Sequence, residues 1–150
     1  MTKQWKPSHS LFLSRTLTVV VFIGLIALPF CIPIMTEWYD AVSGQAPIAT
    51  LLNIVLYCSD AVGFVAIWHL NRLLNNIRRQ EIFVEGNVTC LRAISWCCFG
   101  IAIIFTVLGF WRSLAWLITF AAVFFGLILR VLKNVFELAV EMRQENDYTI

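Results

Sequence analysis

Charge is scarce in this chain, and recognisable catalytic motifs are absent from it. Only 13% of its 150 residues are charged, whereas 60% are hydrophobic. The sequence has no phosphate-binding P-loop and no dinucleotide-binding glycine signature. Its two histidines, His9 and His69, form no paired zinc motif and no recognisable pattern with a Ser or Cys nucleophile. We therefore expect a protein that is not an enzyme and that needs no cofactor.

Cysteine is present, but not in an arrangement that predicts a metal centre. Cys90 and Cys97 share a helix face at a spacing of seven residues, yet neither His nor a carboxylate accompanies them. Free thiols inside apolar stretches usually pack as small hydrophobic groups. The cysteines in such stretches are Cys31, Cys58, Cys97 and Cys98. We expect all five cysteines to be packing residues and no metal to be bound.

Long uncharged stretches dominate the chain instead. Residues 16–36 carry no charge, and Asp60 is the only charged residue in 46–70. Each stretch is long enough to cross a bilayer core, which takes about 20 residues of helix. A third stretch, 93–129, is far too long for one crossing, and we expect it to fold back as a hairpin around 109–113. The predicted fold class is an all-α membrane protein with four transmembrane helices, the last extended into the cytoplasm.

A single four-helix transmembrane domain accounts for residues 1–150. Its predicted parts are spans at about 16–36, 47–70, 92–111 and 114–133, an amphipathic cytoplasmic loop at 71–91 and a cytoplasmic tail helix at 134–150. We expect a short polar arm before the first span. Pro29 and Pro33 each remove a backbone hydrogen bond, which predicts a kink in the outer half of that span.

Particular residues predict where the later helices begin and end. Pro47 favours the first position of the second helix. Gly86 is predicted to break that helix, and Asn87 to cap the third, which would begin just before Arg92. Apolar residues keep a helical spacing beyond the fourth span, so we expect one continuous helix to about Glu145.

Basic residues cluster on one side of the predicted spans. Of the eleven Lys and Arg residues, only Arg112 falls in an outer connection. The positive-inside rule then places both termini in the cytoplasm. The residues on the cytoplasmic side are Lys3, Lys6, Arg15, Arg72, Arg78, Arg79, Arg92, Arg130, Lys133 and Arg143.

Asp60 lies near the predicted bilayer midplane, where an ionised carboxylate costs about 2.5–3.5 kcal/mol on insertion scales. Asn53 and Tyr57 precede it by seven and three residues and share its helical face. These three residues form a candidate intramembrane polar site. We expect Asp60 to be neutral and to face the interior. Three roles stay open for it: a polar contact between helices, proton or cation movement, and packing that responds to a signal.

The cytoplasmic segments carry opposite charges. Glu137, Glu141 and Glu145 recur at a spacing of four and form an acidic stripe on the tail helix. Docking of this helix beside the basic loop is one interpretation; topology control by the loop and a solvated acidic face is the other. The candidate partner-binding residues are Arg72, Arg78, Arg79, Asn87, Arg92, Glu137, Glu141, Glu145 and Asp147.

Two segments resemble a known family. The stretch LNRLLNNIRRQEIFVEGNVTCLR, at 70–92, looks like the cytoplasmic loop of a bacterial family of four-span membrane proteins known only as a domain of unknown function, DUF-2975. The ending ELAVEMRQENDYTI, at 137–150, is similar to the ending of that family. Gly86 and Cys90 stand where more polar family residues are expected. The matching positions are Phe83, Asn87, Leu91, Arg92, Phe136, Glu145, Asn146, Asp147 and Thr149.

The resemblance implies a multi-pass protein of the bacterial inner (plasma) membrane. Members are often encoded beside a small helix-turn-helix regulator, which implies a membrane partner for a transcription factor. We expect a sensory or regulatory protein that contacts such a cytoplasmic partner and does not itself bind nucleic acid. The alternative is a small oligomeric transporter or ion-conducting protein that uses Asp60. The lipid bilayer is the other expected partner, and self-association stays open.

Overall fold

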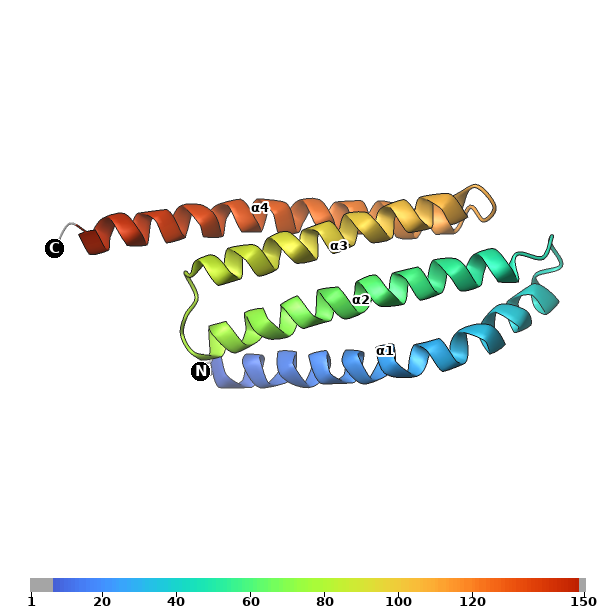
Figure 1. The fold of residues 1–150 in the computed structure, drawn as a ribbon, viewed down its shortest axis with the longest axis horizontal. Helices are drawn as coiled ribbons and strands as arrows, with labels where there is room; N and C mark the ends of the chain where they lie inside the picture. The colour runs from blue at the N-terminus through green and yellow to red at the C-terminus, as the bar shows by residue number, and fades with distance from the viewer. Residues whose placement is uncertain (1–6, 149–150) are drawn as a thin grey trace, which may run out of the picture.

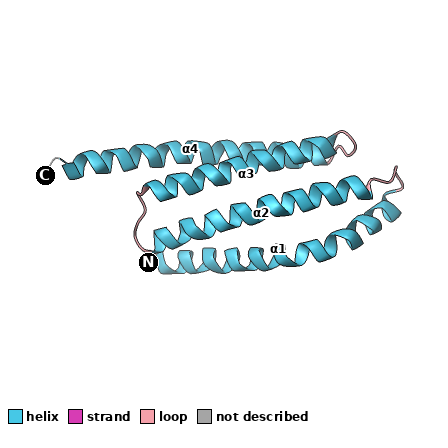
Figure 2. Ribbon diagram, viewed as in Figure 1, coloured by secondary structure: helices cyan, strands magenta, loops and turns pink. Residues whose placement is uncertain are grey.

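Four long helices form the fold in the computed structural model, which describes residues 7–148, although not the side chains at 7–11 and 147 (Figure 1). They are α1 (Pro7–Ser43), α2 (Ala49–Arg78), α3 (Glu85–Gly109) and α4 (Ala115–Tyr148). Figure 2 shows only helices and short connections in this part of the chain. All four helices are long and apolar enough to cross a membrane. The predicted class, an all-α membrane protein with four spans, is confirmed.

The helices carry large apolar side chains on their exposed faces. Such exposure would be unfavourable in water but is expected in a bilayer, where a helix satisfies its backbone polar groups internally and presents apolar groups to lipid. We therefore assign these faces to lipid contact. Examples from the four helices are Leu17, Phe30, Ile54, Trp68, Ile103, Leu117 and Phe120.

The helices pack as an open row rather than as a closed bundle. Close packing joins α1 to α2, α2 to α3 and α3 to α4. Within residues 7–148, α1 does not pack closely against α3 or α4, nor α2 against α4. Figure 1 shows the chain running back and forth in this order. Each edge helix therefore has a single neighbour in the chain.

The row has two chemically different ends. The basic end holds the start of α1, the connection 79–84 and the last part of α4, with Arg72, Arg78, Arg79, Arg92, Arg130, Lys133 and Arg143. The opposite end holds the connections 44–48 and 110–114. Figure 1 shows α4 continuing past the connection 79–84 at the basic end.

α1 is longer than the sequence indicated. It begins at Pro7, so the expected polar arm of residues 1–15 is largely helical within the described residues. Proline is tolerated at the first helical position because no intrahelical acceptor awaits its missing N–H group. Pro29 and Pro33 both lie inside the helix. Figure 1 shows α1 bending along the half that holds them.

α2 begins two residues later than expected. The Asp40 carboxylate, at the end of α1, accepts hydrogen bonds from the backbone N–H groups of Ile48, at 3.0 Å, and Ala49, at 2.7 Å. A carboxylate at this position satisfies free N–H groups and complements the positive end of the helix dipole. The prediction that Pro47 begins α2 was wrong because the cap comes from the preceding helix.

The connection between α2 and α3 is shorter than the predicted loop 71–91, and side-chain hydrogen bonds hold it in place. The second helix was expected to continue past residue 70 as far as Gly86. α2 does continue past residue 70, but it ends at Arg78, and α3 begins at Glu85. Gly86 does not break α2, and Asn87 does not cap α3: both lie in the first turn of α3. The prediction that α3 begins just before Arg92 was also wrong.

Asn87 instead holds the connection together from inside. Its side chain is fully buried, with 0% exposure. Its amide group donates to the carbonyls of Glu81, at 2.9 Å, and Ile82, at 2.7 Å. Its side-chain oxygen accepts a hydrogen bond of 2.8 Å from the amide of Asn76 on α2. One side chain thus links α2, the connection and α3.

Replacing Asn87 tests this role. We expect Asn87→Ala to lower the free energy of unfolding by about 1–3 kcal/mol, because the Asn76 amide and two loop carbonyls lose their partner. Equilibrium unfolding in mixed detergent micelles measures the change. Asn75→Ala is the matched control, since Asn75 is exposed. Equal stability of the two variants would contradict the assignment.

Candidate functional site

The candidate intramembrane polar site lies at the packing surface between α1 and α2. The Tyr57 hydroxyl donates a hydrogen bond of 3.0 Å to the carbonyl of Pro29. That carbonyl lacks its usual helical donor, because the residue four positions later is Pro33, which has no N–H group. A side chain of α2 thus supplies the donor that α1 lacks. One turn away, Thr36 donates to the Asn53 side-chain oxygen at 2.8 Å.

Asp60 differs from Asn53 and Tyr57, because the described part of the chain gives its side chain no hydrogen-bond partner. It is 8% exposed, and its Oδ1 atom is buried without a hydrogen bond among the described residues. The next turn of its helix packs closely on α1, since a Cβ at Gly63 would lie 3.1 Å from the Leu25 side chain. The structure therefore brings Asn53 and Tyr57 against α1 and leaves the third residue of the predicted set unpartnered.

Arg112 holds the two connections at the opposite end together. It donates a hydrogen bond of 2.9 Å to the Ala46 carbonyl, and its guanidinium group lies 5.7 Å from the centre of the Tyr39 ring. This contact is a cation–π interaction. Together with the Asp40 cap, it fixes the end where both connections turn back. Sequence analysis had placed Arg112 in an outer connection but had predicted no contact for it.

The basic end brings together residues from α3 and α4. Arg92 pairs with Glu137 at 3.4 Å, and Glu137 also accepts a hydrogen bond from Lys133. The Lys133 hydrogen bond lowers the pKa of Glu137, and the nearby positive charge of Arg92 acts in the same direction. The ionised form of Glu137 and its bonds therefore persist at neutral pH. They are lost as the pH falls below the ordinary carboxyl range.

The polar part of α4 also contacts the connection 79–84. The Phe83 and Phe136 rings lie 5.9 Å apart, and Arg143 donates to the Phe83 carbonyl at 3.5 Å. Gln144 donates to the Glu85 side chain at 3.5 Å. The last part of α4 therefore docks on the start of α3 and on the connection before it.

The predicted partner-binding residues are distributed unevenly in this arrangement. Arg92 and Glu137 meet, whereas Asn87 is buried. The described contacts pair none of the α2 arginines with Glu137 or Glu141. The side chain of Asp147 lies outside the described residues. The α2 arginines are Arg72 and Arg78, with Arg79 directly after the helix.

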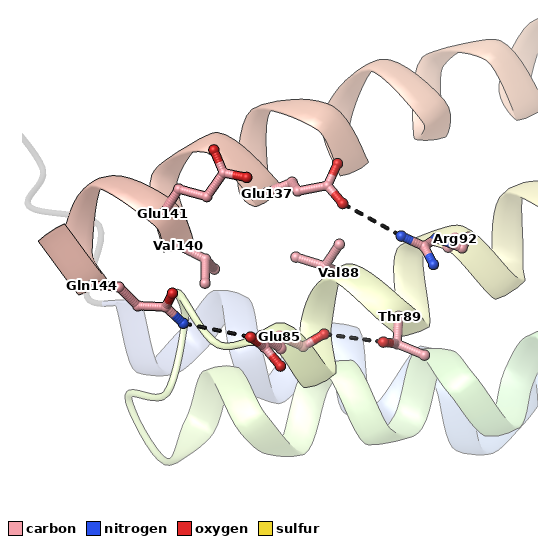
Figure 3. A pocket seen from close by; sticks show the side chains of 8 residues that line it. All are labelled: Glu85, Val88, Thr89, Arg92, Glu137, Val140, Glu141 and Gln144. Carbon is pink, nitrogen blue, oxygen red and sulfur yellow. Dashed lines mark hydrogen bonds and ion pairs between the residues drawn. The ribbon is translucent and has the colours of Figure 1, made fainter.

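A cavity of about 330 Å³ lies between α3 and the polar part of α4; we call it the tail cavity. Figure 3 shows Val88 and Val140 between the two helices, with charged and polar side chains around them. Both valines are buried. Among the described residues, no three His, Cys, Asp or Glu side chains are placed to hold a metal ion. The lining residues are Glu85, Val88, Thr89, Arg92, Glu137, Val140, Glu141 and Gln144.

Comparison with known proteins identifies a family but adds no characterised relative. No curated protein and no solved structure matches the chain. The family described as "Protein of unknown function (DUF2975)" matches residues 17–150. This match covers most of α1, all of α2 and α3, and α4 with its docked end. The chain therefore belongs to the DUF2975 family.

Proposed function

We propose that this protein is a non-enzymatic regulatory protein of the bacterial inner membrane, and that it binds a cytoplasmic protein at the tail cavity. The observation that carries the proposal is the docking of α4 on α3 beyond its apolar part, which forms a cavity with an apolar floor and an acidic rim. A helix-turn-helix regulator is the partner that the family resemblance implies.

The charge distribution supports a cytoplasmic position for the basic end. An even number of crossings places the start of α1 and the end of α4 on the same side. Eight basic residues that the fold brings to this end, Arg15 among them, obey the positive-inside rule if the end is cytoplasmic, and the opposite end has Arg112. The tail cavity then faces the compartment in which transcriptional regulators occur.

Cysteine labelling tests this orientation. We expect a membrane-impermeant maleimide to modify Gln45→Cys in intact cells and to leave Glu81→Cys unmodified, each on a cysteine-free background. Both positions are exposed, and they lie at opposite ends of the row. Labelling of Glu81→Cys after membrane permeabilisation is the control. The reverse pattern in intact cells would contradict the proposed orientation.

The chemistry of the tail cavity favours a basic partner surface. Glu137 is already bonded to Arg92 and Lys133, so Glu85 and Glu141 are the rim carboxylates most open to a partner. A Lys or Arg side chain combines an apolar stem with a charged head. Its stem fits against Val88 and Val140 while its head meets the rim. Charge complementarity of this kind also increases the association rate.

Reversing one rim charge tests the partner site. We expect Glu141→Lys to weaken capture of a helix-turn-helix regulator about tenfold, because like charges then meet across the interface. Pull-down in gentle detergent from the native host, with identification and quantification by mass spectrometry, measures capture at low and physiological salt. Glu81→Lys is the matched control, because Glu81 is exposed at the same end but does not line the cavity. Equal capture by wild type and Glu141→Lys would contradict the proposed site.

A second candidate function rests on Asp60. A buried carboxyl oxygen without a partner lies on the helix that packs against the proline-containing half of α1. Ionisable residues inside membranes often mark ion or proton pathways, and broken helices often border such sites. This observation supports the alternative of a small transporter or ion-conducting protein.

Substitution of Asp60 separates the two functions. If Asp60 carries protons or cations, Asp60→Asn should abolish a pH-dependent flux in proteoliposomes, because the amide does not exchange a proton near neutral pH. A pH-sensitive dye inside the liposomes measures this flux. Ser59→Ala, which removes a polar group of the same helix that bonds the Val55 carbonyl and lies outside the candidate site, is the control. Flux that survives Asp60→Asn unchanged would remove the transport function as stated.

A further inference from the structure

A second, smaller cavity lies between α3 and α4, where the apolar part of α4 ends. It has a volume of about 20 Å³ and is lined by Arg92, Ser95, Arg130 and Lys133; we call it the basic cavity. Arg92 also lines the tail cavity, and the carboxylate of Glu137, bonded to Arg92 and Lys133, lies on the tail-cavity side. Cationic groups from two helices therefore converge on one small space.

The positive charge around this space exceeds the negative charge. Among the described contacts, Glu137 is the one carboxylate that bonds both Arg92 and Lys133. Arg130 forms no ion pair among the described residues; its guanidinium group lies 5.3 Å from the centre of the Trp96 ring. Three cationic side chains thus line the cavity, and one carboxylate, that of Glu137, bonds two of them. An anion at the cavity would balance the remaining charge.

The inner wall of the basic cavity is held by close packing. Ser95 is 1% exposed and donates a hydrogen bond of 2.9 Å to the Gly126 carbonyl of α4. A Cβ at Gly126 would lie 3.1 Å from the Phe99 ring, so glycine permits this close approach. Lys133 is also constrained, because its side chain is only 15% exposed. Lys133 and the buried wall around Ser95 are therefore preorganised, which lowers the entropic cost of binding, whereas Arg92 and Arg130 stay accessible to a ligand.

The size of the basic cavity fits part of an anion. A space of about 10–15 Å³ on this measure holds one water molecule. The cavity therefore accommodates one oxygen atom, and the rest of a larger group would extend out of it past the lining residues. The planar guanidinium group suits bidentate recognition of phosphate, and a lysine ammonium group supplies a point charge.

The surroundings indicate that such a phosphate belongs to a lipid. Trp96, Leu127 and Val131 are exposed, apolar and close in sequence to the lining residues. Tryptophan and arginine at the end of an apolar stretch are typical of the membrane interface, where lipid phosphates lie. We infer that the basic cavity binds the phosphate of an anionic phospholipid, with its acyl chains along the exposed apolar surface of α3 and α4. This inference does not rest on the proposed partner.

Lipid titration followed by native mass spectrometry tests the inference. The detergent-purified protein is titrated with phosphatidylglycerol or phosphatidylcholine, and the bound lipid is counted. We expect wild type to prefer phosphatidylglycerol, and Arg130→Gln to bind it about fivefold more weakly, as the loss of one interfacial basic group predicts. Arg15→Gln is the matched control, since exposed Arg15 lies on α1 at the same end but outside the cavity. Equal weakening in both variants would overturn a specific site.

Two further measurements distinguish a site for an anionic lipid from a site for a free anion. Arg130→Lys keeps the charge but loses the bidentate guanidinium group, so it should bind phosphatidylglycerol more weakly than wild type but more tightly than Arg130→Gln. Loss in this variant equal to that in Arg130→Gln would show that the charge of residue 130 is not the cause, and would overturn the inference. Inorganic phosphate at millimolar concentration should leave lipid binding unchanged. Displacement of the lipid by inorganic phosphate, or equal binding of both lipids, would assign the cavity to a free anion or to no headgroup.

Discussion

The bilayer interior offers no water to backbone groups, and the rest of this structure depends on that constraint. Helices meet it by pairing their own N–H and C=O groups. Proline breaks the pattern, because it leaves an earlier carbonyl without a donor. In α1, the hydroxyl of Tyr57 supplies the donor that Pro33 lacks, so the break in one helix becomes a bond to its neighbour. This bond is important because α1 packs closely only against α2.

Further directional contacts lie at the two ends of the row. At the opposite end, Asp40 caps α2, and Arg112 bonds one connection to the other. At the basic end, Asn87 links α2 to α3, while Arg92 and Glu137 join α3 to α4. Apolar packing between membrane helices has little hydrophobic driving force, because lipid is equally apolar. Polar contacts at the ends therefore contribute specificity in addition to the hydrogen bonds that Tyr57 and Ser95 make within the spans.

The basic end combines two kinds of surface within a short distance along α4. The basic cavity lies at the end of the apolar part, where lipid phosphates are expected, and the tail cavity lies beyond it. Arg92 contributes to both, and Glu137 bonds Arg92 to Lys133. In our proposals, lipid binds on one side of this ion-pair cluster and a protein partner on the other, so both would act on the position of α4. Such an arrangement suits a regulatory membrane protein.

The sequence predicted the four spans because their length and lack of charge are direct physical requirements of a bilayer. It did not predict the open row, since apolar residues on every face give no preferred neighbour. The predicted starts of α2 and α3 were wrong, because Asp40 and Asn87 form hydrogen bonds with residues several positions away along the chain. Local helix propensity does not describe such contacts. Arg130 and Lys133 share a helix face at a spacing of three, so the sequence alone could predict that these two lining residues lie together. The contribution of Arg92 required the packing of α3 on α4.

The central claim is that the polar end of α4 is docked on the start of α3 as one ordered unit. Pulsed electron–electron double resonance tests this docking most directly. Spin labels are attached at Glu81→Cys and Asn146→Cys on a cysteine-free background, and the distance between them is measured in lipid nanodiscs. Both positions are exposed, and they lie on the two segments that the docking joins. We expect a single narrow distribution of distances between the two spin labels. A broad distribution, or several separate distances, would contradict it.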